Sequence, residues 1–320
     1  MRFCKCTAAA LLSASFGVVS GAATAAWPDK PVRVIIPWAP GGSTDIVGRI
    51  LAADMPAHMN RQQVIIDNRP GGGAIIGMQL AAAAAPDGYT YMLQSTGYGH
   101  LIQKANVDYV DSFEPVAMVG TADSALVVTP SLPVKTVKDL IELAKKRPGQ
   151  LLYSSSGIGG FPHMNTELFK LKTGVNMVHV PFKGGGPAIA DTVAGHTQIH
   201  LGSIPTEMGF IRAGKLKVLA VGGKKPNPQL PGVPLISDTV PGYVTYIWYG
   251  FFAPKGTPAA VIAQMNAAVK ASTSNPEVVK KLDQQGVAVE QMSPADFGRL
   301  MKAETDKWLE VIKAAGIKGE

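Results

Sequence analysis

The sequence predicts an α/β protein of two lobes, each a mostly parallel sheet flanked by helices. Three observations lead to this prediction. Short β-branched runs, the first at residues 32–36, alternate with amphipathic stretches, which is the pattern of strand–helix units. The pattern restarts near Ala125, and a mainly helical tail from Pro258 closes the chain. A length of 320 residues is enough for roughly two domains.

Strands are expected where apolar runs are bounded by glycine, proline and small polar residues, and helices where apolar residues recur every three or four positions. The expected strands cover 32–36, 64–66, 89–93, 116–119, 125–129, 151–153, 176–180, 198–201, 216–221 and 246–253. The expected helices cover about 46–55, 75–85, 137–146, 163–173, 187–194, 259–274, 276–285 and 294–315, with Thr136 as the N-cap of the third.

The lobes are expected to be connected by two crossings of the chain, near residues 121–126 and 246–250. One lobe then comprises residues 27–124 together with 249–320, so that it includes the C-terminal helices. The other lobe comprises residues 125–248.

Residues 1–26 have the composition of a cleavable signal peptide, which predicts export of the mature chain. Two basic residues precede an apolar stretch at 8–20, and Ala23-Thr24-Ala25 is a cleavage site of small residues. Both cysteines of the chain lie inside this segment, so the mature protein is expected to contain no disulfide and no cysteine metal site. No other stretch reaches about 18 uninterrupted apolar residues, which predicts a soluble mature chain.

Composition narrows the classes of partner. Hydrophobic residues make up 46% of the chain and charged residues 17%, as in globular proteins. The net charge of +7 is dispersed, and the longest basic run is Lys145-Lys146-Arg147, without interleaved aromatic residues. We therefore expect no nucleic-acid partner. The glycine-rich segments match neither the phosphate-binding loop nor the dinucleotide fingerprint, so no nucleotide cofactor is expected.

Two matching loops are the strongest functional signal. Residues 39–45 (APGGSTD) and 154–160 (SSSGIGG) each follow a predicted strand and precede a predicted helix. Glycine allows a ligand to approach the backbone, and a helix N-terminus offers unpaired N–H groups and a partial positive charge. Ligands of open α/β sheets bind beyond the carboxyl ends of the strands, where such loops lie. The pair predicts one anion-binding loop on each lobe, although either loop alone is compatible with an ordinary capped turn.

Catalytic and metal-binding arrangements are weakly supported. Neither Ser155 nor Ser156 lies in a G-x-S-x-G motif, and His163 is more typical of a packing or polar contact. The six histidines are dispersed, without the spacing of a metal site. Asp45 is more typical of a helix cap than of a base. A secreted hydrolase that uses Ser156 or Asp45 remains the alternative from another class.

Several motifs together resemble the Bug receptors, the extracytoplasmic solute receptors of tripartite tricarboxylate transporters. The resemblance extends in order through the mature chain, and its motifs are VIIP with PGG and Asp45, NRPG with Gly77, PDGYT at 86–90, YSSSG at 153–157, VPFKGG at 180–185 and APKGTP at 253–258. It implies a periplasmic-binding-protein (Venus-flytrap) fold and a cleft that binds a small carboxylate through main-chain N–H groups. Phe161-Pro162 before His163 departs from the small polar residues common there.

The residues and the resemblance together predict a periplasmic receptor that delivers a small organic acid to the membrane permease of a tripartite transporter. A ligand sensor for a signalling partner is the alternative. We expect a monomer without catalytic residues, metal or cofactor. Main-chain donors, hydroxyl groups and a tryptophan wall are expected to contact the ligand, and these residues are Trp38, Ala39, Gly41, Gly42, Ser43, Thr44, Asp45, Thr96, Ser155, Ser156, Gly157, Gly159 and Pro205.

Overall fold

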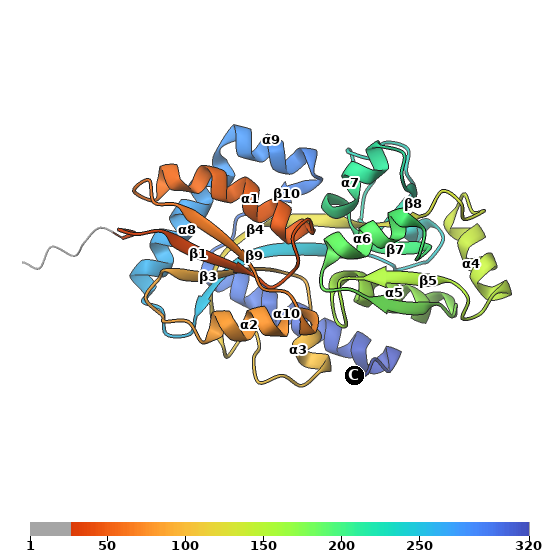
Figure 1. The fold of residues 1–320 in the computed structure, drawn as a ribbon, viewed down its shortest axis with the longest axis horizontal. Coiled ribbons are helices and arrows are strands. Elements are labelled where there is room, and N and C mark those ends of the chain that lie inside the picture. The colour runs from red at the N-terminus through yellow and green to blue at the C-terminus, as the bar shows by residue number, and fades with distance from the viewer. Residues whose placement is uncertain (1–26, 320) are drawn as a thin grey trace, which may run out of the picture.

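Two long strands, β4 (Phe113–Val128) and β9 (Tyr246–Pro254), run through the middle of the molecule, and two α/β lobes lie on either side (Figure 1). The structure is a computed structural model and describes residues 27–319. The predicted signal peptide, residues 1–26, lies outside the described residues.

The remaining strands are short, and most carry apolar residues. They are β1 (Val32–Ile36), β2 (Val64–Asn68), β3 (Thr90–Ser95), β5 (Leu152–Ser155), β6 (Val178–Pro181), β7 (Ile199–Ser203), β8 (Lys217–Val221) and β10 (Val287–Val289).

The helices follow the strands of each lobe and also form the C-terminal tail. They are α1 (Ser43–Asp54), α2 (Ile75–Ala82), α3 (Gly99–Ile102), α4 (Val137–Lys146), α5 (Phe161–Thr173), α6 (Gly185–Ala194), α7 (Ile204–Arg212), α8 (Ala259–Ser274), α9 (Pro276–Gln284) and α10 (Pro294–Ala315). Three 3-10 turns are η1 (Met55–His58), η2 (Gly72–Ala74) and η3 (Ile236–Asp238).

One continuous path of paired strands connects the lobes, in the order β2-β1-β3-β9-β4-β7-β5-β6. The first lobe is built on β1, β2 and β3, which are parallel. The second lobe is built on β5, β6 and β7, which are also parallel. Strand β4 belongs to both sheets, because it pairs with β9 and β10 up to Asp123 and with β7 and β8 from Ser124 onward. The lobe boundaries at 124/125 and 248/249 remain predictions.

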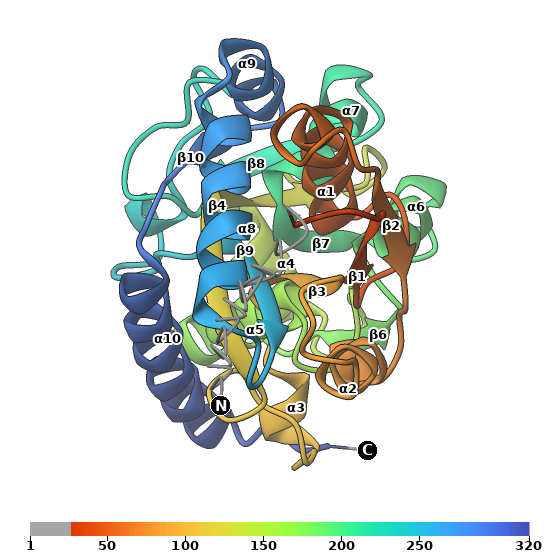
Figure 2. The same cartoon turned by 90° about the vertical axis from the view of Figure 1, so that its left-hand side faces the viewer.

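Each lobe has its own hydrophobic core. The core of the first lobe includes all of β1 except Arg33, together with aromatic residues of β9 and the C-terminal helices. Two clusters on opposite faces of the second sheet form the core of the other lobe. Helix α10 packs against β4 and reaches α5 of the second lobe. Figure 2 shows it on the side of the molecule opposite to β2.

Local sequence signals explain where several elements begin. Thr136 caps α4 as predicted, because its Oγ1 accepts a hydrogen bond from the backbone N–H of Asp139 at 3.1 Å. The Asp139 carboxylate accepts the N–H of Thr136 in return, at 3.0 Å. Ser293 caps α10 in the same way through the N–H of Asp296.

The structure differs from the predicted elements in two ways. The strands expected at 116–119 and 125–129 are parts of the single strand β4. Polar residues separate the two apolar runs, but they still pair with neighbouring strands. The hydroxyl of Ser124 also forms a hydrogen bond of 2.7 Å with the hydroxyl of Thr245. Helices α3 and α7 and strand β10 were not predicted. Within residues 27–319, no helix is both long enough and apolar enough to cross a membrane.

Candidate functional site

A small cavity lies between the two lobes, where the carboxyl ends of their parallel strands face each other. It has about 30 Å³ of space for the centres of water-sized molecules, which is room for roughly two waters. Both lobes contribute to its wall, together with Ile247 of β9. The lining residues are Trp38, Gly42, Ser43, Thr44, Ser95, Thr96, Ser156, Phe161, Pro162, Gly185, His200, Ser203, Thr206 and Ile247.

Four helices begin at this cavity. Helix α1 begins at Ser43, α5 at Phe161, α6 at Gly185 and α7 at Ile204, and residues of each first turn or its N-cap line the wall. None of the four has a side-chain hydrogen bond at its N-cap. Helix N-termini carry a partial positive charge and unpaired N–H donors. The helix starts therefore favour a negatively charged group in the cavity, although no Lys or Arg occurs among the described residues that line it.

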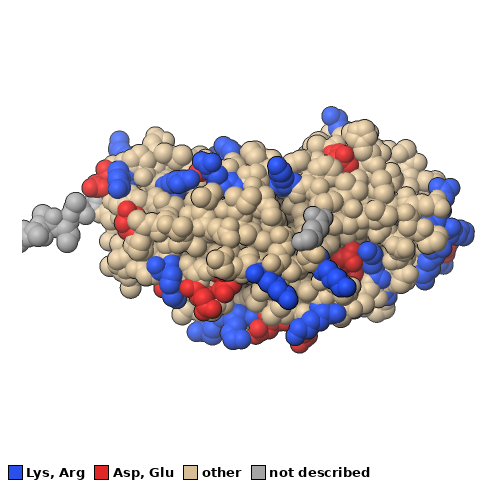
Figure 3. Space-filling model, turned by 60° about the horizontal axis from the view of Figure 1, so that its bottom comes forward, with Lys and Arg blue, Asp and Glu red and all other residues tan. Residues whose placement is uncertain are grey.

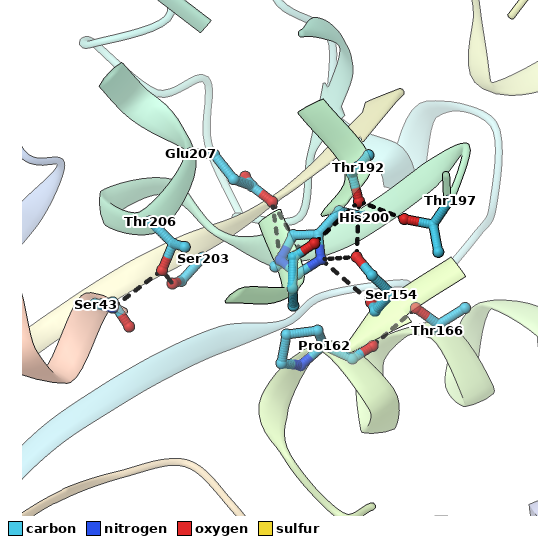
Figure 4. Close-up of polar contacts among 12 residues, drawn as sticks. Ser43, Ser154, Pro162, Thr166, Thr192, Thr197, His200, Ser203, Thr206 and Glu207 are labelled. Carbon is cyan, nitrogen blue, oxygen red and sulfur yellow. Dashed lines mark hydrogen bonds and ion pairs between the residues drawn. The ribbon is translucent and has the colours of Figure 1, made fainter. Parts of the chain in front are cut away.

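Hydroxyl groups connect these helix starts across the cleft. The backbone N–H of Ser43 donates a hydrogen bond of 3.0 Å to Thr206 Oγ1, which also lies 3.1 Å from Ser203 Oγ (Figure 4). On the first lobe, Thr44 Oγ1 donates to Ser95 Oγ at 2.8 Å. The wall is thus made of small polar groups that can donate or accept.

Trp38 and Thr96 have fixed orientations. Trp38 is 5% exposed, and its Nε1 donates to the Gln94 side-chain oxygen at 2.6 Å. Thr96 Oγ1 accepts the backbone N–H of Trp248 at 3.1 Å. Because Nε1 of Trp38 already has a partner, Trp38 contributes its apolar ring to the cavity wall. The hydroxyl of Thr96 is hydrogen-bonded to the backbone of β9.

Backbone contacts hold the two lobes together on either side of the cavity. On one side, the N–H of Ala39 donates to the carbonyl oxygen of Lys183 at 3.2 Å. On the other, the N–H of Tyr98 donates to the carbonyl oxygen of Gly159 at 2.8 Å. The structure is therefore a closed form of the cleft.

A buried histidine forms part of the second-lobe wall. Nδ1 of His200 lies 2.8 Å from Ser154 Oγ and 3.2 Å from the Ser154 carbonyl oxygen, and the Ser154 hydroxyl continues to Thr192 (Figure 4). Since a carbonyl can only accept, Nδ1 carries the proton. Nε2 lies 3.9 Å from Glu207 Oε1. Burial lowers the pKa of His200 to about 4 and raises the pKa of Glu207 well above its usual value.

The predicted residues divide into two groups. The structure brings Trp38, Gly42, Ser43, Thr44, Thr96 and Ser156 together at the cavity wall. The others lie beside it and do not line it in this closed form, and these are Ala39, Gly41, Asp45, Ser155, Gly157, Gly159 and Pro205.

Asp45 supports the first loop from outside the cavity. Its Oδ2 accepts the backbone N–H of Gly41 at 3.0 Å, and its carboxylate also contacts Arg49 and Asn68. Burial raises the pKa of Asp45, but the hydrogen bonds from Arg49, Gly41 and Asn68 outweigh it and leave the pKa lowered. Asp45 therefore stabilises the first loop through three hydrogen-bond partners, and its carboxylate is not available as a general base.

A serine–histidine pair is present, but it joins Ser155 to His179 and not a serine to His163. Ser155 Oγ lies 2.5 Å from His179 Nε2, whereas His163 accepts the backbone N–H of Gly159 at 3.1 Å. Ser155 has no exposed surface and does not line the cavity. A nucleophile must reach its substrate, so this geometry does not favour hydrolysis.

Gly185, His200 and Thr206 line the cavity but were not among the predicted ligand-binding residues. Gly185 follows strand β6, and the carboxyl ends of parallel strands lie at one edge of a sheet, so the loop after β6 could have been included. Thr206 belongs to helix α7, one of the two helices that were not predicted. His200 stands alone in the sequence and offers no motif.

Comparison with known proteins decides the family. Residues 47–317 match the model of the tripartite tricarboxylate transporter family receptors. The chain belongs to this family. Protein BugT of Bordetella pertussis is 30% identical to the receptor over 311 residues, which cover 95% of each chain.

Solved structures resemble the receptor over nearly its whole length. "R. palustris Rpa4515 with adipate" is 35% identical, has a TM-score of 0.88 and covers 91% of the receptor and 99% of its own chain. "MatC (Rpa3494) from Rhodopseudomonas palustris with bound malate" is 28% identical, has a TM-score of 0.85 and covers 89% and 100%. The family and these neighbours are solute-binding receptors, which confirms the predicted fold class and family.

Proposed function

We propose that this receptor captures a small organic anion with at least one carboxylate in the interlobe cavity. The observation that carries the proposal is the convergence of four helix N-termini, without N-cap side-chain bonds, on one cavity. A carboxylate is small, planar and negatively charged, and it can accept several N–H and O–H donors at once. The relatives that hold adipate and malate support this ligand class.

The cavity residues suggest how the ligand would be held. Ser43 and Thr44 would donate from the start of α1, while Gly185 and Thr206 would do so from α6 and α7. Ser156 would contribute a hydroxyl from the second-lobe loop, and Trp38 an apolar wall. Because room for roughly two waters matches one carboxylate group rather than a whole dicarboxylate, a longer acid requires the lobes to separate slightly.

Binding would then drive closure of the cleft. A ligand that contacts both lobes stabilises the closed form by its difference in affinity between the closed and open forms. We propose that the closed receptor acts in the periplasm, where it presents the acid to a tripartite-type membrane permease and catalyses no reaction. The family match supports this role.

A panel of small acids tests the proposal. Adipate, malate and a set of other C2–C8 mono- and dicarboxylic acids are titrated into the full mature chain by isothermal titration calorimetry, with adipamide as an uncharged control of the same length as adipate. We expect at least one acid to bind with 1:1 stoichiometry and to raise the melting temperature, because a ligand at about 100 times its Kd adds roughly 2.7 kcal/mol of stability. Failure of adipate, malate and the other C2–C8 acids to bind, or equal binding of adipamide, would contradict the proposal.

A further inference from the structure

Behind the cavity wall, two histidines stack on each other. The rings of His163 in α5 and His179 in β6 lie 4.1 Å apart between centroids, with an interplanar angle of 22°. The ring of Tyr153 in β5 continues the stack at 5.0 Å from His179. His163 is 5% exposed and His179 is half-buried. This pair lies outside the residues that line the cavity.

Each ring bonds to one end of residues 155–159, the second-lobe loop. The Gly159 N–H donates to Nδ1 of His163 at 3.1 Å. At the other end, His179 Nε2 lies 2.5 Å from Ser155 Oγ, which also accepts the Gly157 N–H at 3.1 Å. The loop is therefore fixed at both ends by neighbouring rings.

The same loop faces both the cavity and the first lobe. Ser156, in its middle, lines the cavity. The carbonyl oxygen of Gly159 accepts the Tyr98 N–H across the cleft at 2.8 Å, beside the bridge between Gly97 and Gly160. A shift of this loop would move a cavity hydroxyl and break a contact between the lobes at the same time.

The geometry also fixes the protonation state of His163. A backbone N–H can only donate, so Nδ1 of His163 is unprotonated and a neutral ring carries its proton on Nε2. Burial, with a smaller contribution from Lys170, lowers the pKa of His163 to about 4. Burial, His163 and Lys170 lower the pKa of His179 to about 3, while Glu167 opposes them.

The titratable groups around the pair come from two elements. Helix α5 contributes Glu167 and Lys170, which form an ion pair of 2.7 Å. Strand β5 contributes Tyr153, whose hydroxyl donates to Glu167 Oε1 at 2.6 Å. Glu167, Lys170 and Tyr153 thus contact one another. The hydrogen bonds to the two ends of the loop come from the imidazole rings of His163 and His179. Protonation of Nδ1 of His163 would place two N–H groups against each other.

We propose that His163 and His179 are positioning residues that hold the 155–159 loop at the cavity wall and against the first lobe, and that protonation of His163 releases the loop. Neither ring lines the cavity itself. The effect of these histidines on ligand affinity rests on the proposed function. Their role in positioning residues 155–159 does not.

Hydrogen–deuterium exchange of the ligand-free mature chain tests the hold directly. His163→Phe removes the acceptor for Gly159, whereas His163→Asn places an oxygen near the position of Nδ1 and cannot titrate. At pH 7.5 we expect the loop amides to exchange roughly fivefold faster in His163→Phe, the effect of one lost hydrogen bond, and near the wild-type rate in His163→Asn. His179→Leu and His179→Gln form the same contrast at Ser155, and the exposed His196→Gln is the control.

The pH profile separates positioning from packing. After correction for intrinsic exchange, and for the exchange of core amides that reports global unfolding, the wild-type loop is expected to lose protection at a higher pH than the loop of His163→Asn as the pH falls toward 4. Unchanged loop exchange in His163→Phe, or the same pH profile in His163→Asn, overturns the proposal. If His163→Phe fails to fold by circular dichroism, the pH profile of His163→Asn decides alone.

The affinity for adipate is measured on the same variants. A weaker affinity in His163→Phe and rescue in His163→Asn would extend the role of the pair to the ligand. If the wild type does not bind adipate, the proposed function loses support for that acid, but the exchange data still decide whether the histidines hold the loop. The two failures are thus distinguishable.

Discussion

The backbone N–H of Ser43, at the start of α1, donates a 3.0 Å hydrogen bond to Oγ1 of Thr206 in α7, across the cleft. A donor at the N-terminus of a first-lobe helix is thus satisfied by a hydroxyl of the second lobe. The closed cleft is therefore stabilised by a direct bond between two helix starts at the cavity wall.

Removing the acceptor of this bond should weaken closure. Thr206→Val keeps the shape of the side chain but cannot accept from Ser43, whereas Thr206→Ser retains a hydroxyl. One hydrogen bond contributes about 1 kcal/mol, so we expect the Kd for a bound acid to rise roughly fivefold in Thr206→Val and to change little in Thr206→Ser. Calorimetric titration measures both. Because Thr206 is also a proposed donor to the ligand, equal affinities in the two variants would show that its hydroxyl contributes neither to closure nor to ligand binding.

A methyl group at Gly186 should obstruct closure without harming the second lobe. A Cβ there would overlap the carbonyl oxygen of Pro40 in the first lobe, although the helical backbone of Gly186 can accept alanine. We expect Gly186→Ala to lower affinity for the acid at least roughly tenfold, with no loss of thermal stability, because alanine favours helices over glycine.

Gly209→Ala is the matched control for that variant. Gly209 also lies in a helix, α7, but a Cβ there would meet no atom within 4 Å. Its affinity should equal that of the wild type. Small-angle scattering with saturating acid should show a more open receptor only for Gly186→Ala, and compact scattering from this variant would contradict the account of closure.

Buried histidines should make the receptor less stable in acid. Burial lowers the pKa of His100, His163 and His200 to about 4 and that of His179 to about 3. A lowered histidine pKa in the folded state stabilises the fold relative to the unfolded chain. This contribution is fully present at pH values above the pKa of histidine in the unfolded chain, which is near 6.5. That stability is lost as the pH falls from 6.5 toward 4, by about 1 kcal/mol per pH unit for each fully buried histidine and by less for the half-buried His179. Urea unfolding at pH 7.5, 6 and 5 measures it, and a flat profile would contradict the buried, neutral state.

Glu207 should show the opposite dependence. Burial raises its pKa, so the stability linked to its proton is present below the unfolded value near 4.5 and is lost as the pH rises. Glu207→Gln mimics the protonated form and can still accept the Gly202 N–H. We therefore expect Glu207→Gln to gain free energy of unfolding relative to the wild type as the pH rises from 5 to 8. A difference that is constant over this range would indicate that Glu207 is ionised in the folded receptor.

Much of the fold could be predicted from the sequence, because its elements carry local signals. The first strand at 32–36 and the helices at 137–146 and 294–315 have the predicted bounds. β-Branched runs mark the strand, and capping residues or a proline mark the helix starts. The continuity of β4 could not be predicted, since it depends on the long-range pairing of Ser124 with β7 and Thr245.

The candidate site was predictable only where it consists of contiguous loops. Ser43, Thr44 and Ser156 lie in glycine-rich turns that signal a helix start. Thr206 and His200 reach the cavity through the packing of β7 and α7, which no short sequence pattern encodes. Glycine-rich turns also do not reveal which of their residues face inward, and Gly159 instead accepts a hydrogen bond from Tyr98 of the first lobe.

A crystal structure of the mature receptor with a bound acid from the panel tests the central claim most directly. We predict a carboxylate in the interlobe cavity, with oxygens within hydrogen-bond distance of backbone N–H groups at the starts of α1 and of at least one of α5, α6 and α7. An acid bound elsewhere, or held in the cleft by lysine or arginine side chains without those backbone donors, would contradict the account.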